Sequence, residues 1–182
     1  MRLTPLEIPE VLLVEPTVHE DSRGFFLETW HAEKFRAAGL DVGFVQDNHS
    51  RSMQYTLRGL HYQLVEPQGK LVRVVTGEIF DVAVDLRRSS STFGQWVGEI
   101  LSADNRRMMW MPAGFAHGYL VLSDQAEVFY KATDYYAPEH ERRLAWNDAR
   151  LGIRWPLPSG VTPLLDPKDA SAAALDAAEC FD

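Results

Sequence analysis

Hydrophobic and polar residues alternate in short runs through the middle of the chain, and turn-forming residues separate the runs. In residues 79–86 the even-numbered positions are apolar, whereas Asp81 and Asp85 fall on the opposite side. Turn sequences such as Gly77 and 89–91 recur at regular spacing. Further strands are expected at 71–75, 96–101, 107–111, 118–122 and 127–133. This pattern predicts an all-β fold, an antiparallel barrel of the jelly-roll kind.

Helical periodicity is weak and confined to the periphery. Residues 31–38 can form two turns that end at Gly39, and the alanine-rich residues 170–178 can form another short helix. Residues 155–167 contain four prolines, so we expect an extended, irregular segment that wraps over the barrel. No repeat, low-complexity tract or linker divides the chain, which predicts a single domain over 1–182.

Composition narrows the possible partners. The 182 residues are 46% hydrophobic and 24% charged, with a net charge of −8, which argues against a nucleic-acid partner. A few Arg and Lys side chains in one cleft can still bind a small anion such as a diphosphate. No apolar run is long enough to span a membrane, and the N-terminus lacks a signal-peptide pattern, so a cytoplasmic location is expected.

Two motifs are similar to the two halves of a cupin barrel. The first is 57–63, Leu-Arg-Gly-Leu-His-Tyr-Gln, and the second is 112–118, Pro-Ala-Gly-Phe-Ala-His-Gly. In metal-binding cupins the first motif carries two His one residue apart and then a Glu. Here Gln63 replaces the second His and Lys70 lies where the Glu is expected. The pocket is therefore predicted to be an organic acid–base site without a metal.

His61 is the best candidate for a general base. Imidazole has an ordinary pKa near 6.5 and is mostly unprotonated at neutral pH. Strict alternation would place Gly59, His61 and Gln63 on one face of the strand and Arg58 on the other. If the first face is the barrel interior, His61 and Gln63 share the pocket and Gly59 leaves room for a ligand.

Lys70 and Tyr130 are candidates for the other catalytic functions. The Lys70 ammonium could stabilise negative charge on a carbonyl oxygen. A Schiff base is the alternative, but it needs a lowered pKa that an acidic pocket would oppose. Tyr130 could donate a proton from the face opposite His61, although a strand tyrosine can also be simple core packing.

A carboxylate partner for His61 and an aromatic surface for a flat ring are also present. Asp169 could orient His61, but sequence spacing does not prefer it over Asp81 or Asp85. Tyr135 and Tyr136 lie in a loop and suit stacking on a nucleotide base.

The chain resembles the dTDP-4-dehydrorhamnose 3,5-epimerase family of metal-free cupins over about residues 4–176. The matching blocks are Asp21–Glu28, Gln46–Ser50, Leu57–Gln63, Gly69–Val72, Thr92–Trp96, Pro112–Gly118, Tyr130–Lys131 and Trp146–Asp148. The resemblance implies a homodimer with exchanged N-terminal strands, so Arg23 and Glu28 would serve the neighbouring pocket. It also implies a dTDP-4-keto-6-deoxyhexose substrate and no cofactor.

The resemblance further assigns roles to individual residues. His61 would remove the protons at carbons 5 and 3, Lys70 would stabilise the enolate, Tyr130 would reprotonate from the opposite face, and Asp169 would pair with His61. The substrate pocket would be lined by Arg23, Glu28, Gln46, Asn48, Arg58 and His117. Of these, Arg23 and Arg58 would meet the diphosphate, and Tyr136 would stack on thymine.

Three alternatives remain at this stage. A relative of the family could invert only carbon 3 or only carbon 5. A metal-dependent cupin oxygenase is disfavoured by Gln63 and Lys70. A non-catalytic sugar-binding cupin would have no need for a base and an acid on opposite sides.

Overall fold

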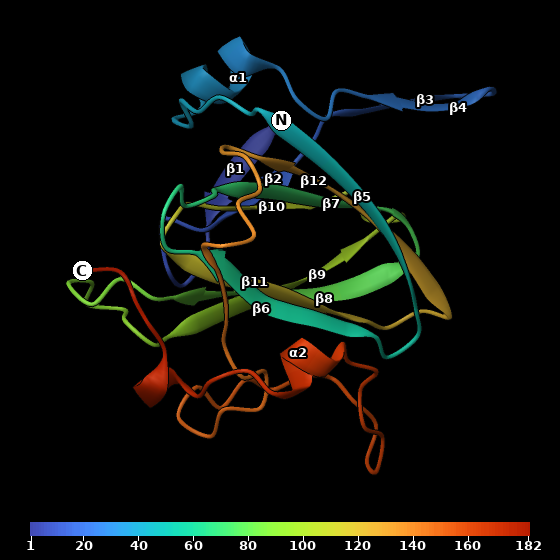
Figure 1. Ribbon diagram of the computed structural model, residues 1–182. Coiled ribbons are helices and arrows are strands. Elements are labelled where there is room, and N and C mark those ends of the chain that lie inside the picture. Colours follow the sequence, from blue (N-terminus) through green and yellow to red (C-terminus); the bar gives the residue numbers. More distant parts are fainter.

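The computed structural model describes all residues, Met1–Asp182, and contains two antiparallel sheets that face each other (Figure 1). In spatial order, the first sheet consists of β1 (Arg2–Pro5), β2 (Leu12–Glu15), β10 (Met108–Met111), β7 (Lys70–Thr76), β12 (Gln125–Ala132) and β5 (Gln46–Met53). The second consists of β13 (Glu141–Arg143), β6 (Leu57–Gln63), β11 (Phe115–Val121), β8 (Glu78–Asp85) and β9 (Trp96–Ser102). Successive strands repeatedly change sheet, and the predicted jelly-roll class is confirmed.

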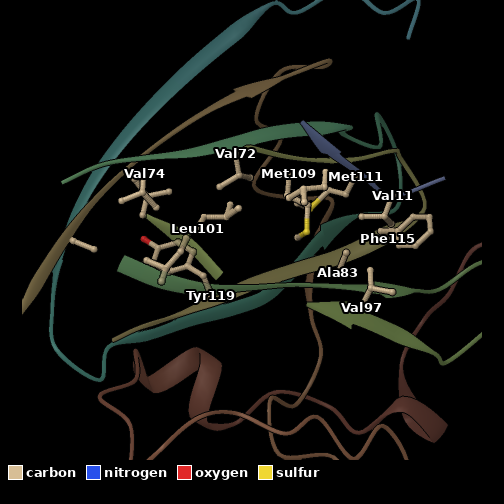
Figure 2. Close-up of a cluster of buried hydrophobic side chains, with 14 of the residues drawn as sticks. Val11, Val72, Val74, Ala83, Val97, Leu101, Met109, Met111, Phe115 and Tyr119 are labelled. Atoms are coloured by element: carbon tan, nitrogen blue, oxygen red, sulfur yellow. The ribbon is translucent and has the colours of Figure 1, made fainter. Parts of the chain in front are cut away.

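The main hydrophobic core fills the space between the two sheets (Figure 2). Val72 and Met109 from the first sheet belong to the same buried cluster as Ala83 and Tyr119 from the second. Removing these side chains from water is the main favourable contribution to barrel stability.

The outer face of each sheet is also covered. Val82 and Val84 of β8 point away from the barrel interior and pack against the C-terminal segment, which includes α2 (Pro167–Ala170) and the 3₁₀ helix η1 (Leu175–Ala177). On the other sheet, α1 (Ala32–Ala37) buries Phe35, as predicted for 31–38. None of the helices is both long and apolar enough to cross a membrane.

A two-stranded hairpin, β3 (Val18–Asp21) and β4 (Gly24–Leu27), forms no sheet with the barrel strands and projects from the body of the molecule (Figure 1). Its Phe25 and Phe26 are 57% and 67% exposed. Two neighbouring phenyl rings left in water are unfavourable for an isolated chain, so this hairpin is a candidate contact surface.

The predicted helix over 170–178 is wrong. Helix α2 ends at Ala170, and Ala173 forms a bridge with Leu144. The Leu175 amide then donates to Asp148 Oδ2 at 2.7 Å, and the Leu175 side chain is buried. These tertiary contacts outweigh the weak helix preference of the alanines. By contrast, the predicted irregular segment over 155–167 is confirmed for residues 155–166, which contain no helix and only the isolated bridge of Leu164, whereas Pro167 begins α2.

Candidate active site

A bulge in β6 determines which side chains face the barrel interior. Two residues of β6, Gly59 and Leu60, lie opposite one residue of β11, Gly118. The extra residue breaks the alternation and brings Arg58 and His61 to the same cavity. The sequence prediction that put Arg58 on the other face from His61 is therefore wrong.

Glycine is required at this bulge. Gly59 has φ of +125°, in a region that favours glycine. A Cβ atom there would lie 2.5 Å from the Gly118 Cα and 2.7 Å from the His117 carbonyl oxygen. The close approach of β6 to β11 that positions His61 thus depends on this residue.

A cavity of about 140 Å³ lies between the two sheets beside β6 and β11, and we call it the inner cavity. It is lined by Ser50, Arg58, His61, Lys70, His117, Tyr119 and Tyr130. His61 comes from the second sheet, whereas Lys70 and Tyr130 come from the first. The structure therefore brings the three main predicted residues together, with His61 and Tyr130 on opposite walls.

His61 forms a hydrogen-bonded pair with Asp169. The His61 Nε2 and Asp169 Oδ1 atoms are 2.7 Å apart. A carboxylate only accepts, so Nε2 carries the proton and Nδ1 is the nitrogen that can take one from a substrate. Burial raises the pKa of Asp169, but the hydrogen bonds from His61 and Gly59 and the Arg143 charge outweigh it, and the pKa lies below its usual value.

A second, similar pair lies deeper in the barrel. His117 Nε2 is 2.7 Å from Asp81 Oδ1, and both residues are buried. Burial lowers the pKa of His117 despite the Asp81 charge, so its ring stays neutral. Asp85 instead pairs with Arg87 at 2.8 Å, so among the three carboxylates considered for His61 only Asp169 contacts it.

Burial changes the proton affinities of both residues on the wall opposite His61. It lowers the pKa of Lys70 to about 8, against the opposing charges of Glu141 and Asp81. The expectation that acidic neighbours would hold this pKa up is therefore wrong, although the ammonium form still dominates at pH 7. Burial raises the pKa of Tyr130, so the phenol keeps its proton.

A second cavity, of about 420 Å³, also borders His61, and we call it the outer cavity. Arg58 and His61 line both cavities, and Arg143 and Asp169 line only the larger one. His61 thus lies at the junction of a small cavity and a larger one that is lined by two arginines, Arg58 and Arg143.

Comparison with known proteins gives the family. The sequence model described as dTDP-4-dehydrorhamnose 3,5-epimerase matches residues 5–177. The chain belongs to this family. The resemblance stated from the sequence motifs is therefore confirmed.

Individual epimerases match over nearly the whole chain. The Pseudomonas aeruginosa dTDP-4-dehydrorhamnose 3,5-epimerase is 59% identical over 182 residues, which cover 100% of this chain and 99% of that one. The Escherichia coli K12 enzyme is 52% identical, with coverage of 97% and 95%. A crystal structure from Legionella pneumophila, in complex with dTDP-4-keto-L-rhamnose, has a TM-score of 0.94 and 49% identity and covers 98% and 94% of the two chains.

Three residues that the family resemblance assigned to the substrate, Gln46, Asn48 and Tyr136, are not among those that line the inner cavity. Gln46 Nε2 donates to Asn48 Oδ1 at 3.0 Å, and the Tyr136 amide donates to Gln46 Oε1 at 2.9 Å. Tyr136 is 53% exposed, so its ring is accessible to a ligand. The three residues form one connected group at the edge strand β5.

Gln63 does not face the cavity, contrary to the sequence prediction. Its amide nitrogen donates to the carbonyls of Glu66 and Tyr135, and its oxygen accepts from the Ala137 amide at 3.0 Å. At the position where metal-binding cupins have a His, this chain therefore uses the side chain to fix the loop that carries Tyr135 and Tyr136.

Arg23 and Glu28 are not brought to the His61 cavity of the same chain. Arg23 pairs with Asp21 near the turn of the hairpin, and Glu28 pairs with Lys34 of α1. These are the two residues that the family resemblance assigned to a neighbouring pocket.

Sequence reasoning missed three residues of the site. Ser50 and Tyr119 share a hydrogen bond of 2.9 Å and line the inner cavity. Alternation could have found Tyr119, which is two residues from His117 on the same strand. No local signal indicated Arg143, because its relation to Asp169 depends on two segments that are distant in sequence.

Proposed function

We propose that this chain converts dTDP-4-dehydro-6-deoxy-D-glucose to dTDP-4-dehydro-L-rhamnose by inverting carbons 5 and 3. The observation that carries this proposal is a base and an acid on opposite walls of one cavity, His61 and Tyr130, with Lys70 beside them. Membership of the epimerase family supports the same reaction.

The first step is proton removal next to the 4-keto group. His61 Nδ1 takes the proton from carbon 5, and the electron pair delocalises into the carbonyl to give an enolate. Asp169 holds the ring and stabilises the imidazolium that forms. The Lys70 ammonium stabilises the enolate oxygen.

The second step inverts the centre. Tyr130 gives its phenolic proton to carbon 5 from the opposite face, which leaves a phenolate and restores the ketone. His61 then loses its proton to solvent, Tyr130 regains one, and the same sequence runs at carbon 3. This scheme uses only groups of the chain and water.

Substrate binding is proposed to use the hydrogen-bonded group of Gln46, Asn48 and Tyr136 together with the outer cavity. Arg58 and the partner's Arg23 would meet the diphosphate, and Tyr136 would stack on thymine beside Gln46 and Asn48. His117 would contact the sugar, and the partner's Glu28 would complete the pocket. These assignments are supported by the exposure of Tyr136 and by the Arg58 guanidinium at the junction of the two cavities.

A homodimer is part of this proposal. The hairpin projects from the barrel with Phe25 and Phe26 exposed, and it carries Arg23, which finds no place in the cavity of its own chain. A second copy would bury these rings and receive Arg23 and Glu28. Sedimentation at micromolar concentration tests the assembly. The expected cytoplasmic location stays a prediction.

The activity is tested by incubating the protein in D₂O with dTDP-4-keto-6-deoxyglucose and following both carbons by NMR. Label and inversion at carbons 3 and 5 are expected. Inversion at one carbon would instead indicate a mono-epimerase, and binding without label would indicate a sugar-binding cupin.

Lys70 offers a second chemical possibility that the same substrate can test. Its pKa of about 8 leaves a fraction of free amine at neutral pH. If Lys70 formed a Schiff base, borohydride would trap a covalent adduct with the ketone. The proposed electrostatic role predicts no adduct at Lys70 by mass spectrometry.

A further inference from the structure

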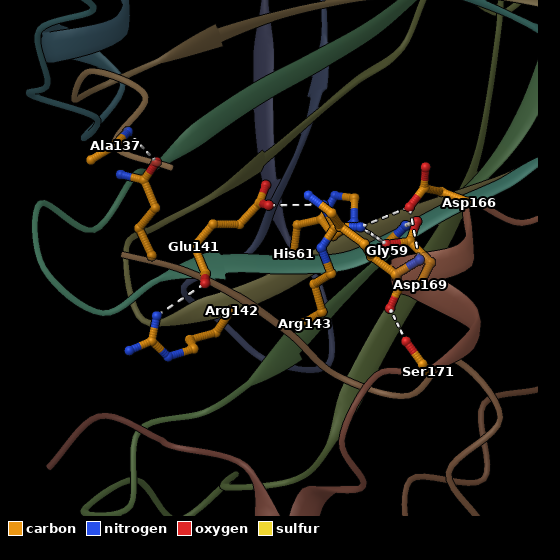
Figure 3. Close-up of polar contacts among 11 residues, drawn as sticks. Gly59, His61, Ala137, Glu141, Arg142, Arg143, Asp166, Asp169 and Ser171 are labelled. Carbon is orange, nitrogen blue, oxygen red and sulfur yellow. Dashed lines mark hydrogen bonds and ion pairs between the residues drawn. The ribbon is translucent and has the colours of Figure 1, made fainter. Parts of the chain in front are cut away.

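The Asp169 carboxylate is shared between the His61 imidazole and a guanidinium group. Its Oδ1 accepts from His61 Nε2 at 2.7 Å and from Arg143 Nη1 at 2.5 Å, while Oδ2 accepts from the Gly59 amide at 3.2 Å (Figure 3). The proposed reaction uses the first of these contacts and gives Arg143 no part. A guanidinium that contacts the same carboxylate oxygen as His61 nevertheless changes the protonation equilibrium of the His61 imidazole.

Arg143 is held firmly in this position. It lies opposite His61 in the pairing of β13 with β6, and its side chain is only 20% exposed. The guanidinium contacts Glu141 Oε2 at 2.8 Å and Asp166 Oδ1 at 3.4 Å in addition to Asp169. The planar fork of arginine suits such simultaneous contacts with several carboxylates.

The electrostatic consequence has a definite sign. A carboxylate that accepts from an imidazole favours the protonated ring, because the resulting imidazolium faces a negative charge. A guanidinium on the same oxygen offsets part of that charge and repels the imidazolium. Arg143 therefore favours the unprotonated form of His61. The Glu141 carboxylate, which contacts the same guanidinium, weakens this electrostatic effect.

Other charged and titratable groups also surround His61. They are Arg58 of β6, Lys70 of β7, His117 and Tyr119 of β11, Tyr130 of β12, and Asp166, which precedes α2. Asp81 of β8 contacts His117. Of these, none is hydrogen-bonded to Asp169 Oδ1, which leaves Arg143 as the cation in direct contact with the pair.

We propose that Arg143 is a positioning residue that fixes Asp169 and extends the action of His61 as a base to lower pH. The negative charge of Glu141 partly offsets the positive charge of Arg143. The inference rests on the proposed function, since it assigns the base role to His61. It predicts that the charge of Arg143, and not only its volume, matters for the pH range of activity.

The pH profile of kcat/KM tests this inference. In Arg143→Gln the acidic limb should move to higher pH by about one unit, because a guanidinium contacting the pair no longer opposes protonation. Activity at pH 6 should then fall up to about tenfold more than activity at pH 8. Arg143→Lys keeps the charge and should keep a limb close to that of the wild type.

Two further variants make the test specific. Glu141→Gln leaves Arg143 unopposed, so its acidic limb should move to lower pH; only this limb is judged, because Glu141 also influences Lys70. Arg142→Gln removes the same charge from the same strand, but Arg142 pairs with Glu179 and not with Asp169. Its profile should match that of the wild type.

An NMR titration of the His61 imidazole separates this inference from the proposed function. The titration midpoint should rise in Arg143→Gln and fall in Glu141→Gln, whether or not turnover is observed. A uniform loss of activity in Arg143→Gln, with an unmoved acidic limb and midpoint, would overturn the inference. If Arg143→Gln does not fold, an unmoved or raised midpoint in Glu141→Gln would overturn it instead.

Discussion

The barrel contains two His–Asp pairs with the same short contact and different surroundings. In each, Nε2 of the His is 2.7 Å from Oδ1 of the Asp. The His61 side chain is 28% exposed and lies between two cavities, whereas the His117 side chain is 8% exposed. Both oxygens of Asp169 have donors, but Asp81 Oδ2 is buried without a hydrogen-bond partner.

This difference is the reason why the proposed function gives the two pairs different roles. A general base must gain a proton and then release it to solvent. At His117, burial disfavours the charged ring, and the nearby Lys70 adds a repulsive charge. At His61, a fully hydrogen-bonded carboxylate is combined with access to two cavities. We therefore assign proton transfer to His61 and substrate contact to His117.

Replacing the two histidines one at a time should give the greatest difference in kcat. His61→Asn should lower kcat by about 10³–10⁴-fold, because it removes the base for both carbons. His117→Asn should cost about tenfold, mostly in KM, because it removes a neutral contact. Steady-state kinetics and dTDP binding by calorimetry check both. Equal losses of kcat in the two variants would contradict the assignment.

Replacing the two aspartates one at a time should give a smaller difference in kcat. Asp169→Asn should lower kcat by about 10²-fold, since the imidazolium loses its partner and the ring can adopt the wrong tautomer. Asp81→Asn should cost less than about tenfold, because its histidine does not change charge. Circular dichroism serves as the folding control. A larger loss of kcat in Asp81→Asn than in Asp169→Asn would reverse the comparison.

Replacing Lys70, on the wall opposite His61, should have the smallest effect, a change in the alkaline limb of the pH profile. The pKa of Lys70 is about 8 in the free protein, so its ammonium is present below that pH and is lost as the pH rises through it. The kcat/KM profile should therefore show an alkaline limb near pH 8. Lys70→Arg should move this limb above pH 10, because a guanidinium stays charged. An unmoved limb in this variant would assign it to another group.

Much of the barrel could be predicted from the sequence because its strands alternate regularly. The strands predicted at 71–75, 79–86 and 96–101 are present with bounds shifted by one residue at most. Strand β5 was missed because its polar sequence, Gln46–Met53, carries little hydrophobic alternation. This strand lies at the edge of its sheet, where fewer side chains need to be buried.

The site was less predictable where it depends on contacts between distant segments. The motif pointed to His61 and Lys70, but the bulge that turns Arg58 inward comes from the pairing of β6 with Gly118. Residue spacing alone did not prefer Asp169 over Asp81, whereas the family resemblance did, and the structure places the Asp169 carboxylate against His61 through the C-terminal segment. The lowered pKa of Lys70 likewise follows from burial, which sequence spacing does not report.

Turnover of Tyr130→Phe in D₂O shows whether the base and the acid act from opposite walls of the cavity. NMR would follow label and configuration at carbon 5 together. We predict that label enters and that the recovered sugar keeps its original configuration, because His61 still removes and returns a proton on its own face. Inversion at the wild-type rate, or no label at all while His61 and substrate binding are intact, would contradict the account.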